Sequence, residues 1–332
     1  MRGFKTIFLA VALAAALVIA VPVYAQQITI GYTPSDWDPA DFHGLFGAGI
    51  ELGLQELGIE YEMIIRAAGD HTAHEEQLSI AEDFIAEGVD YIVINPTDYD
   101  VQQRTYEVVL ESGIPLIVGN FNIPFPEEWG IGQPMLLSGY SHEDAGLMMA
   151  DYLVEHYPEG TNIAVISAAP GRVSDARGQL ELHEANGFNI VYQEYAYAER
   201  MRSYDTMERI ITAYPETEVV LALSSMMAVG AVEAVEAAGM RGQFDIYGAG
   251  GTLEELIAIE EGKLAGAWKR DEIAMGKAVA ETIQLHMQGR EDEIEPIFNS
   301  PIVMIDSVEA INEHVPAVIY TEAGYEFPRP LP

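Results

Sequence analysis

A loop of aromatic and acidic residues follows the first predicted strand, and its chemistry suits a ligand rich in hydroxyl groups. Residues 33–39 read TPSDWDP. An indole face can stack on C–H groups while carboxylates accept protons from hydroxyls, as a sugar site requires. Trp37 and Asp38 are therefore candidate contacts; the alternatives are that Trp37 covers the core and that Asp41 only caps a helix. The acids are spaced somewhat like a calcium loop, but Ala40 replaces a ligand and no glycine supplies the turn, so no metal is expected.

A second candidate is the side-chain amide of Asn95, which ends an apolar run. Residues 88–100 read GVDYIVINPTDYD, and an unbroken run such as 91–94 is typical of a strand buried in a parallel sheet. Pro96 ends the strand and leaves Asn95 and Asp98 at its carboxyl end, where open α/β sheets bind small polar ligands. The alternative is an Asn-Pro turn with a helix cap. We favour Asn95 as a ligand contact and Asp98 as a cap.

Other predicted strand ends carry further candidates. Asn120, Ser224 and Gly250 each follow a strand pattern, and Arg177 falls on the first turn of a predicted helix. The planar guanidinium of Arg177 could hold a hydroxyl pair or a carboxylate; an exposed salt bridge is the alternative. The glycines at 248–251 do not follow G-x-G-x-x-G, so neither a dinucleotide nor any other cofactor is expected.

Alternating strand and helix patterns must position these side chains. Strands are predicted at 28–32, 61–67, 91–94, 114–118, 162–167, 189–195, 219–223 and 244–247. Helices are predicted at 42–57, 72–86, 142–156, 174–185, 203–213, 226–238 and 253–261. One more is predicted between the strands 91–94 and 114–118 and ends at about 112. Such alternation indicates an α/β fold with parallel sheets and right-handed crossovers. Its two halves predict two doubly wound, Rossmann-like domains with a ligand cleft between them.

The first 25 residues resemble an export signal. Arg2 and Lys5 precede an apolar core at 7–21, and residues 23–25, VYA, form a small-x-small cleavage site. A single spanning helix is the alternative, but we expect cleavage after Ala25 and a periplasmic protein. No cysteine is present to form disulfides or accept a lipid. The formal net charge of −37 excludes nucleic acid and anionic lipid surfaces as partners.

Several segments, in this order and spacing, resemble the type I periplasmic binding proteins, the ribose- and galactose-binding protein family. They are VDYIVINPTD (89–98), IPLIVGN (114–120), DARG (175–178), MMAVGAVEAVEAAG (226–239) and EEGKLAGAW (260–268). The resemblance covers essentially the whole chain after the signal. It implies a ligand enclosed between two domains, with roles for Trp37, Asp38, Phe42 and Asn95. It also implies roles for Arg177 and for Tyr197, which lies near an aromatic position of the family.

Four positions depart from the family's sugar binders. Asn120-Phe121 replaces an Asp-Arg pair, Ser224-Ser225 replaces Asn-Asp, Gly250 replaces an aspartate, and Arg270 stands where ribose binders have a glutamine. The site therefore loses carboxylates and keeps two arginines. These departures favour a ligand with fewer hydroxyls, or one that carries a carbonyl or carboxylate, over ribose itself.

The resemblance implies three chain segments that join the domains. The first domain would comprise 26–140 and 271–299, and the second 141–270 and 300–332. We expect a monomer that closes about a hinge on a sugar-like ligand and delivers it to an ABC-type permease. The alternative is a sensor that docks on a membrane kinase or chemoreceptor.

An enzyme and a DNA-binding regulator are disfavoured by the sequence. A G-x-S-x-G elbow is missing, and His71 and His74 lack zinc-protease spacing, so these two are read as helix-surface residues. A regulator of the lac-repressor type would need a helix-turn-helix where the export signal stands.

Overall fold

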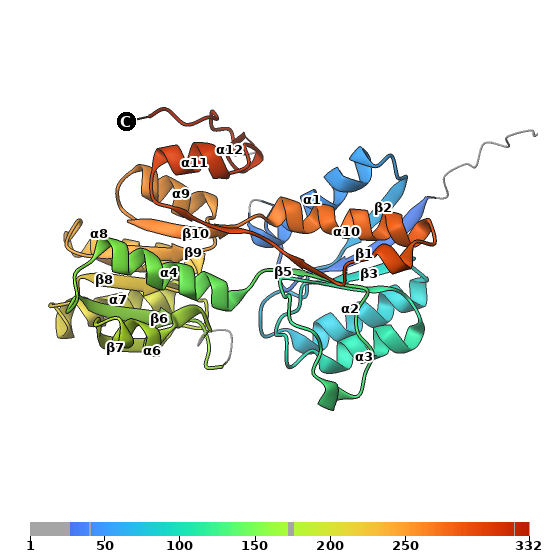
Figure 1. Ribbon diagram of the computed structural model, residues 1–332, viewed down its shortest axis with the longest axis horizontal. Coiled ribbons are helices and arrows are strands. Elements are labelled where there is room, and N and C mark those ends of the chain that lie inside the picture. The colour runs from blue at the N-terminus through green and yellow to red at the C-terminus, as the bar shows by residue number, and fades with distance from the viewer. Residues whose placement is uncertain (1–26, 40, 172–175, 322, 332) are drawn as a thin grey trace, which may run out of the picture.

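The chain forms two α/β units, each built on one six-stranded sheet (Figure 1). This computed structural model describes residues 27–39, 41–171, 176–321 and 323–331. The strand order is β11-β5-β4-β3-β1-β2 in the first sheet and β12-β10-β9-β8-β6-β7 in the second. The two units lie side by side, and helices cover both faces of each sheet. The predicted export signal lies outside the described residues.

The first unit contains the elements up to Gly139. Its strands are β1 (Ile28–Thr33), β2 (Tyr61–Ile65), β3 (Tyr91–Ile94), β4 (Leu116–Gly119) and β5 (Leu136–Gly139). Its helices are α1 (Phe42–Glu56), α2 (His74–Glu87), α3 (Gln103–Ser112) and the short 3-10 helix η1 (Glu127–Trp129). α1 and α2 follow the strands β1 and β2, so the strand-to-helix loops carry the first group of candidate residues.

The second unit begins with α4 (His142–His156). Its strands are β6 (Asn162–Ser167), β7 (Asn189–Tyr195), β8 (Val219–Ala222), β9 (Asp245–Ala249) and β10 (Gly266–Arg270). Its helices are α6 (Leu180–Ala185), α7 (Arg200–Ala213), α8 (Ser225–Ala237) and α9 (Leu253–Glu260). The remaining elements are α10 (Glu272–Met287), η2 (Glu291–Glu293), β11 (Ile297–Asn299), β12 (Ile302–Ile305), α11 (Val308–His314) and α12 (Val318–Thr321).

The chain passes between the two units three times. β5 lies in the first sheet, whereas α4 packs into the core of the second unit. β10 lies in the second sheet, whereas α10 packs into the core of the first. β11 then pairs with β5, and β12 pairs with β10. Three short connections, at 140–141, at 271 and at 300–301, therefore join the units.

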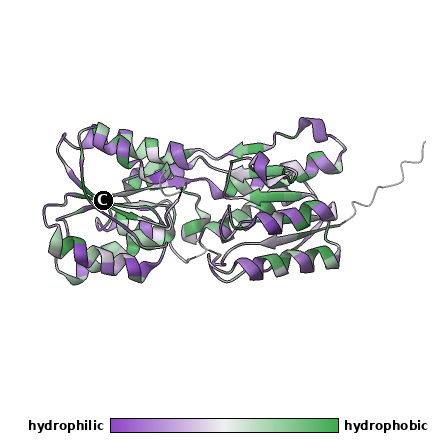
Figure 2. Ribbon diagram, turned by 90° about the horizontal axis from the view of Figure 1, so that it is seen from below, coloured by the Kyte–Doolittle hydropathy of each residue, from purple (hydrophilic) through white to green (hydrophobic). Residues whose placement is uncertain are grey.

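The strands are hydrophobic on both faces because each sheet is covered on two sides. All four residues of β3 are buried. Val93 packs into a cluster with α1 and α10, whereas Ile94 packs into a cluster with α2 and α3 on the opposite face. Figure 2 shows hydrophobic strands enclosed by helices that carry hydrophilic residues on part of their surface. This arrangement is typical of doubly wound parallel sheets.

α1 and α10 approach closely because glycines line their contact. A Cβ atom on Gly49 would lie 2.5 Å from the carbonyl oxygen of Ile273, and one on Gly276 would lie 2.2 Å from that of Phe46. Both neighbours are backbone atoms, which cannot rotate away. The position of α10 against the first sheet therefore depends on the absence of side chains here.

Replacing Gly276 by alanine is expected to lower the free energy of unfolding by about 1–3 kcal/mol, because the added methyl group forces the two helices apart. Urea denaturation followed by circular dichroism would measure the change. Glu281→Ala, at an exposed position of the same helix, is the control and should stay within about 0.5 kcal/mol of the wild type. Equal unfolding midpoints for both variants would refute the close-packing argument.

The predicted α/β fold with two mostly parallel sheets is confirmed, and β3, β6 and β7 have the predicted limits. The prediction of parallel sheets is wrong for one strand, because β12 is antiparallel to β10. The reason is geometric. β11 ends at the edge where the two units meet, so after two linking residues β12 must enter the second sheet from the end at which the parallel strands finish.

A second correction concerns the helix predicted at 174–185. Residues 176–178 are helical, Gln179 has φ 43°, and α6 starts only at Leu180. The side chain of Gln179 donates to the carbonyl of Ala176, which itself packs against Gly146 of α4. Local hydrogen bonding and a tertiary contact thus interrupt the helix; residues 174 and 175 lie outside the described part of the chain. No helix within the described ranges is long and apolar enough to cross a membrane.

Candidate ligand-binding site

Asn95 lies in a buried hydrogen-bond network at the carboxyl end of β3. Its side-chain Nδ2 donates to the hydroxyl of Tyr32 at 2.8 Å and lies 3.1 Å from Nδ1 of His43. Its carbonyl oxygen accepts from Gln77, and its Oδ1 has no hydrogen-bond partner in the described part of the chain. Asp98 accepts from the backbone amides of Asp100 and Val101, which lie in the turn before α3. α3 begins only at Gln103 and has no side-chain cap, so Asp98 stabilises this turn and does not cap the helix as predicted.

The loop after β1 carries Trp37 and Asp38 at the surface. The indole is 40% exposed, and its edge meets the ring of Tyr32 with centroids 6.2 Å apart. Asp38 is exposed, and its carbonyl oxygen accepts from the amide of Asp41. Trp37 is thus supported by Tyr32 and partly open to solvent, so its ring can be reached by a ligand that stacks on it.

Arg177 lies in a pocket of neutral groups in the second unit. Its guanidinium donates to Nδ1 of His142 at 3.1 Å, to the carbonyl of Leu223 at 3.2 Å and to the hydroxyl of Tyr140. Among the residues that the structure describes, no carboxylate forms an ion pair with it. Burial lowers the pKa of Arg177, and the neighbouring charge of Arg270 acts in the same direction. Arg177 is partly buried and not fully exposed, and an ion pair with residues 172–175 lies outside the described part of the chain.

Arg270 connects the two units. It ends β10 of the second sheet, and its guanidinium lies 4.2 Å from the ring of Phe42, the first residue of α1. The same guanidinium lies 4.9 Å from the ring of Tyr140 and 5.9 Å from that of Trp268. Its Nε is 3.7 Å from Glu272. The carboxyl ends of both sheets therefore meet at Arg270.

Arg177 and Arg270 share their aromatic neighbours. Arg177 lies 5.7 Å from the Tyr140 ring and 5.6 Å from the Trp268 ring. We call these residues, with Phe42, the arginine–aromatic cluster. It brings two cations together over aromatic faces, which attract cations.

Three strand-end candidates offer less than their sequence suggested. Asn120 adopts φ 69°, and its buried Oδ1 has no partner among the described residues. The hydroxyl of Ser224 accepts from the amide of Met227 and caps α8. Gly250, with φ 143°, carries no side chain, and a Cβ there would lie 2.2 Å from Oγ of Ser225. Asn120 keeps an unused acceptor, whereas Ser224 serves the helix.

Tyr197 is held at the edge of the second sheet. It follows the edge strand β7, is 49% exposed, and its ring is covered by Arg202 at 4.9 Å. It also lines a hollow of about 370 Å³ with residues of β7 and α7. Its described neighbours, on β7 and α7, do not belong to the arginine–aromatic cluster.

Burial sets the electrostatics of the first-unit half of the site. It lowers the pKa of His43 well below its usual value, and the charge of His71 adds to this effect, so His43 is neutral at pH 7. Burial also raises the pKa of Asp41, although the amide of Phe42 and the guanidinium of Arg270 oppose the rise. The field of Arg270 therefore reaches groups of the other unit.

Several residues of the site were missed by the sequence reasoning. Tyr140 and Trp268 are apolar-looking residues beside the crossings between units, and only their contacts with the arginines identify them. His43 follows Phe42 and reads as an ordinary helix residue, yet it bonds Ser35 at 2.9 Å. His71 was read as a helix-surface residue, but it precedes α2 and lies 3.4 Å from Asp36. The one signal in the sequence was His43, which follows Trp37 by six residues and could have been read as a polar residue of the same site.

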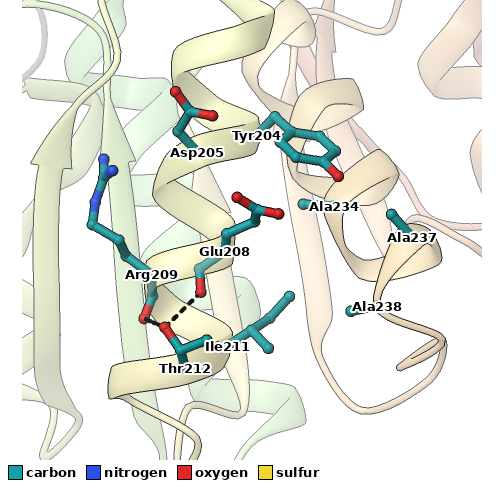
Figure 3. A pocket seen from close by; sticks show the side chains of 9 residues that line it. All are labelled: Tyr204, Asp205, Glu208, Arg209, Ile211, Thr212, Ala234, Ala237 and Ala238. Carbon is teal, nitrogen blue, oxygen red and sulfur yellow. Dashed lines mark hydrogen bonds between the residues drawn. The ribbon is translucent and has the colours of Figure 1, made fainter.

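A larger hollow lies away from these residues. It measures about 640 Å³ and lies between α7 and α8, where Tyr204 and Glu208 extend toward Ala234 of α8 (Figure 3). Ligands of open α/β sheets bind at the carboxyl ends of strands, and this hollow lies between two helices. We therefore place the candidate site at the arginine–aromatic cluster.

Comparison with known proteins gives the family. The family model described as "Periplasmic binding protein domain" matches residues 30–291. The ribose import binding protein of Bacillus subtilis is 24% identical over 279 residues, which are 83% of this chain and 87% of that protein.

Two solved structures share the fold. An ABC transporter periplasmic solute binding protein from Actinobacillus succinogenes with bound D-allose has a TM-score of 0.75 and 20% identity, covering 86% of this chain and 100% of that one. A solute binding protein from Bacillus halodurans with bound myo-inositol has a TM-score of 0.71 and 23% identity, covering 85% and 95%. The chain thus belongs to the periplasmic binding protein domain family, as its sequence predicts, and so to a family of binding proteins and not of enzymes.

Proposed function

We propose that this protein binds a sugar or polyol between its two units, closes around it, and presents the closed form to an ABC-type permease. The observation that carries the proposal is the contact of Arg270, from the second sheet, with Phe42 of the first unit, because it brings ligand-type side chains of both units together. The names of the similar proteins agree with it, since ribose, D-allose and myo-inositol are all rich in hydroxyls.

The proposed contacts divide by chemistry. The indole of Trp37 would stack on the ligand, and Asp38, Asn95 and Asn120 would meet its hydroxyls from the first unit. Arg177 and Arg270 would donate hydrogen bonds to the ligand from the second unit, and backbone groups at Ser224 and Gly250 would complete the second unit's side of the site. Tyr197 is the weakest member of the set because it is covered by Arg202 at the sheet edge.

The two arginines also bear on the charge of the ligand. Arg177 has no carboxylate partner among the described residues, and Arg270 has only Glu272 at 3.7 Å. A buried guanidinium that lacks a counter-charge is stabilised by a carboxylate or by a fork of hydroxyls. We infer a ligand that carries a carboxylate or a carbonyl beside its hydroxyls.

Closure would be a hinge motion at the three connections. We propose domains of 26–140 with 271–299, and of 141–270 with 300–332, because both units are covalently continuous only at those connections. A monomer exported with residues 1–25 removed would act in the periplasm. Small-angle scattering should show a smaller radius of gyration with ligand, and mass spectrometry of the exported protein should give a chain that starts at Gln26.

Calorimetric titration tests the ligand class directly. Protein stripped of ligand by unfolding and refolding would be titrated with D-ribose, D-allose, myo-inositol and glucuronate. We expect a one-to-one complex with micromolar or lower Kd for at least one, and a change in tryptophan fluorescence, because Trp37 lies half exposed in the site. The absence of heat with every compound, and of any small molecule retained by the natively purified protein, would count against the proposal.

A further inference from the structure

Asp36, His43 and His71 form a cluster that the ligand-binding argument does not use. They come from the loop after β1, the first turn of α1 and the turn before α2. Nε2 of His71 lies 3.4 Å from Oδ2 of Asp36, and Nε2 of His43 lies 3.9 Å from the same oxygen. One donor atom of each residue lies within 4.8 Å of the other two.

Two imidazole nitrogens and one carboxylate oxygen are a donor set that transition metals prefer. Zinc binds nitrogen and carboxylate oxygen at about 2.1 Å, so the ligand atoms of a tetrahedral site lie about 3.4 Å apart. The distance from Nε2 of His71 to Oδ2 of Asp36 already has this value. The distance from Nε2 of His43 to the same oxygen would have to shorten by about half an ångström to reach the tetrahedral spacing. The hydroxyl of Ser35 lies 2.9 Å from His43 and 3.2 Å from Asp36, so it shares the same space.

The outer nitrogens of both histidines have partners that orient the rings. Nδ1 of His71 lies 3.4 Å from the carbonyl oxygen of Thr97, which can accept its proton and direct Nε2 toward Asp36. Nδ1 of His43 faces the amide of Asn95. A half-turn of that amide would present Oδ1, which now has no partner among the described residues, to the Nδ1 proton of His43. Metal-binding histidines usually have such outer partners.

We propose that Asp36, His43 and His71 form a binding site for a divalent transition metal such as Zn²⁺, at the carboxyl end of β1 beside Trp37. Three protein donors leave a fourth position for water, for Ser35 or for a hydroxyl of a bound ligand. The positive charge of the nearby Arg270 repels a metal cation at this site. The net charge of −37 attracts cations to the molecule as a whole. The site stands on its own residues and does not depend on which organic ligand the protein binds.

Titration with Zn²⁺ after chelation tests the site. The wild type should bind one Zn²⁺ per chain, and Co²⁺ in its place should give the visible absorption of a four-coordinate complex, which hexahydrated Co²⁺ lacks. Asp36→Asn and His71→Ala should each weaken Zn²⁺ binding at least tenfold and remove the Co²⁺ absorption. Both side chains are partly exposed, so these variants should fold.

His314→Ala is the control, because His314 also lies beside a carboxylate, at 4.0 Å from Glu313, but far along the chain. It should bind Zn²⁺ as the wild type does. Wild-type protein without a one-to-one Zn²⁺ complex, or equal binding by all three variants, would overturn the proposal. The sugar panel run on metal-free protein keeps this result separate from the proposed function, since either test can fail alone.

Discussion

Replacing Arg177 by alanine is expected to weaken ligand binding by on the order of 100-fold or more while the protein stays folded. The guanidinium is partly buried and donates to His142, Leu223 and Tyr140. It has no carboxylate partner among the described residues, so a bound ligand would supply its strongest partner. Removing it costs the ligand a charge-assisted hydrogen bond and leaves a hollow beside Tyr140. Calorimetry with the ligand found in the panel measures the loss, and circular dichroism checks the fold.

Matched variants make the Arg177 result specific. Arg177→Lys keeps the charge but loses the planar fork, so its affinity should fall between those of the wild type and Arg177→Ala. Trp37→Ala should also weaken binding, through lost stacking. Arg290→Ala removes a surface arginine that pairs with Glu293 and should change nothing. If Arg177→Ala and Trp37→Ala both bind as Arg290→Ala does, the site has been assigned to the wrong residues.

The second large effect concerns a buried ion pair at a crossing between the units. Lys269 at the end of β10 contacts Glu272 at the start of α10, and both are at most 2% exposed. Lys269→Met would leave Glu272 buried without its closest partner, which typically costs about 3–5 kcal/mol of unfolding free energy. Arg270, 3.7 Å from Glu272, would place the loss toward the lower value.

A double replacement distinguishes a lost pair from lost packing. Lys269→Met combined with Glu272→Met should cost less than Lys269→Met alone, because no uncompensated charge remains. Lys277→Met is the control, since Lys277 pairs with Glu56 on the surface and should cost about 1 kcal/mol or less. A loss from Lys269→Met no larger than that from Lys277→Met would show that the buried pair is not needed for stability.

Sequence periodicity predicted the sheets because parallel strands are buried on both faces and therefore read as short apolar runs. β3 and β6 were predicted at their observed limits for this reason. β5, β10, β11 and β12 were not individually predicted; each lies next to a crossing between the units, where the strand–helix alternation along the chain is interrupted. The direction of β12 follows from where β11 ends, which no local pattern contains.

Candidate residues were predicted where a polar side chain interrupts an apolar run. Asn95 and Asn120 stood out in this way, whereas Arg177 stood out by its place on the first turn of a predicted helix. Tyr140 and Trp268 did not, because aromatic residues beside strands usually belong to a core. Their role depends on tertiary contacts with Arg177, and for Tyr140 also with Arg270. The partners of Ser224 were also hidden, since a serine at a helix start can face either the helix or a ligand.

By itself, the sequence determined the family, the α/β class and the positions at which strands end, because these depend on patterns within a few dozen residues. Only the tertiary structure decided which strand ends meet. Arg270 contacts Phe42, 228 positions earlier in the chain. Asp36, His43 and His71 come together from the loop after β1, the first turn of α1 and the turn before α2. Such contacts arise from packing two sheets through three connections, and side-chain distances between units are a property of that packing and not of any segment.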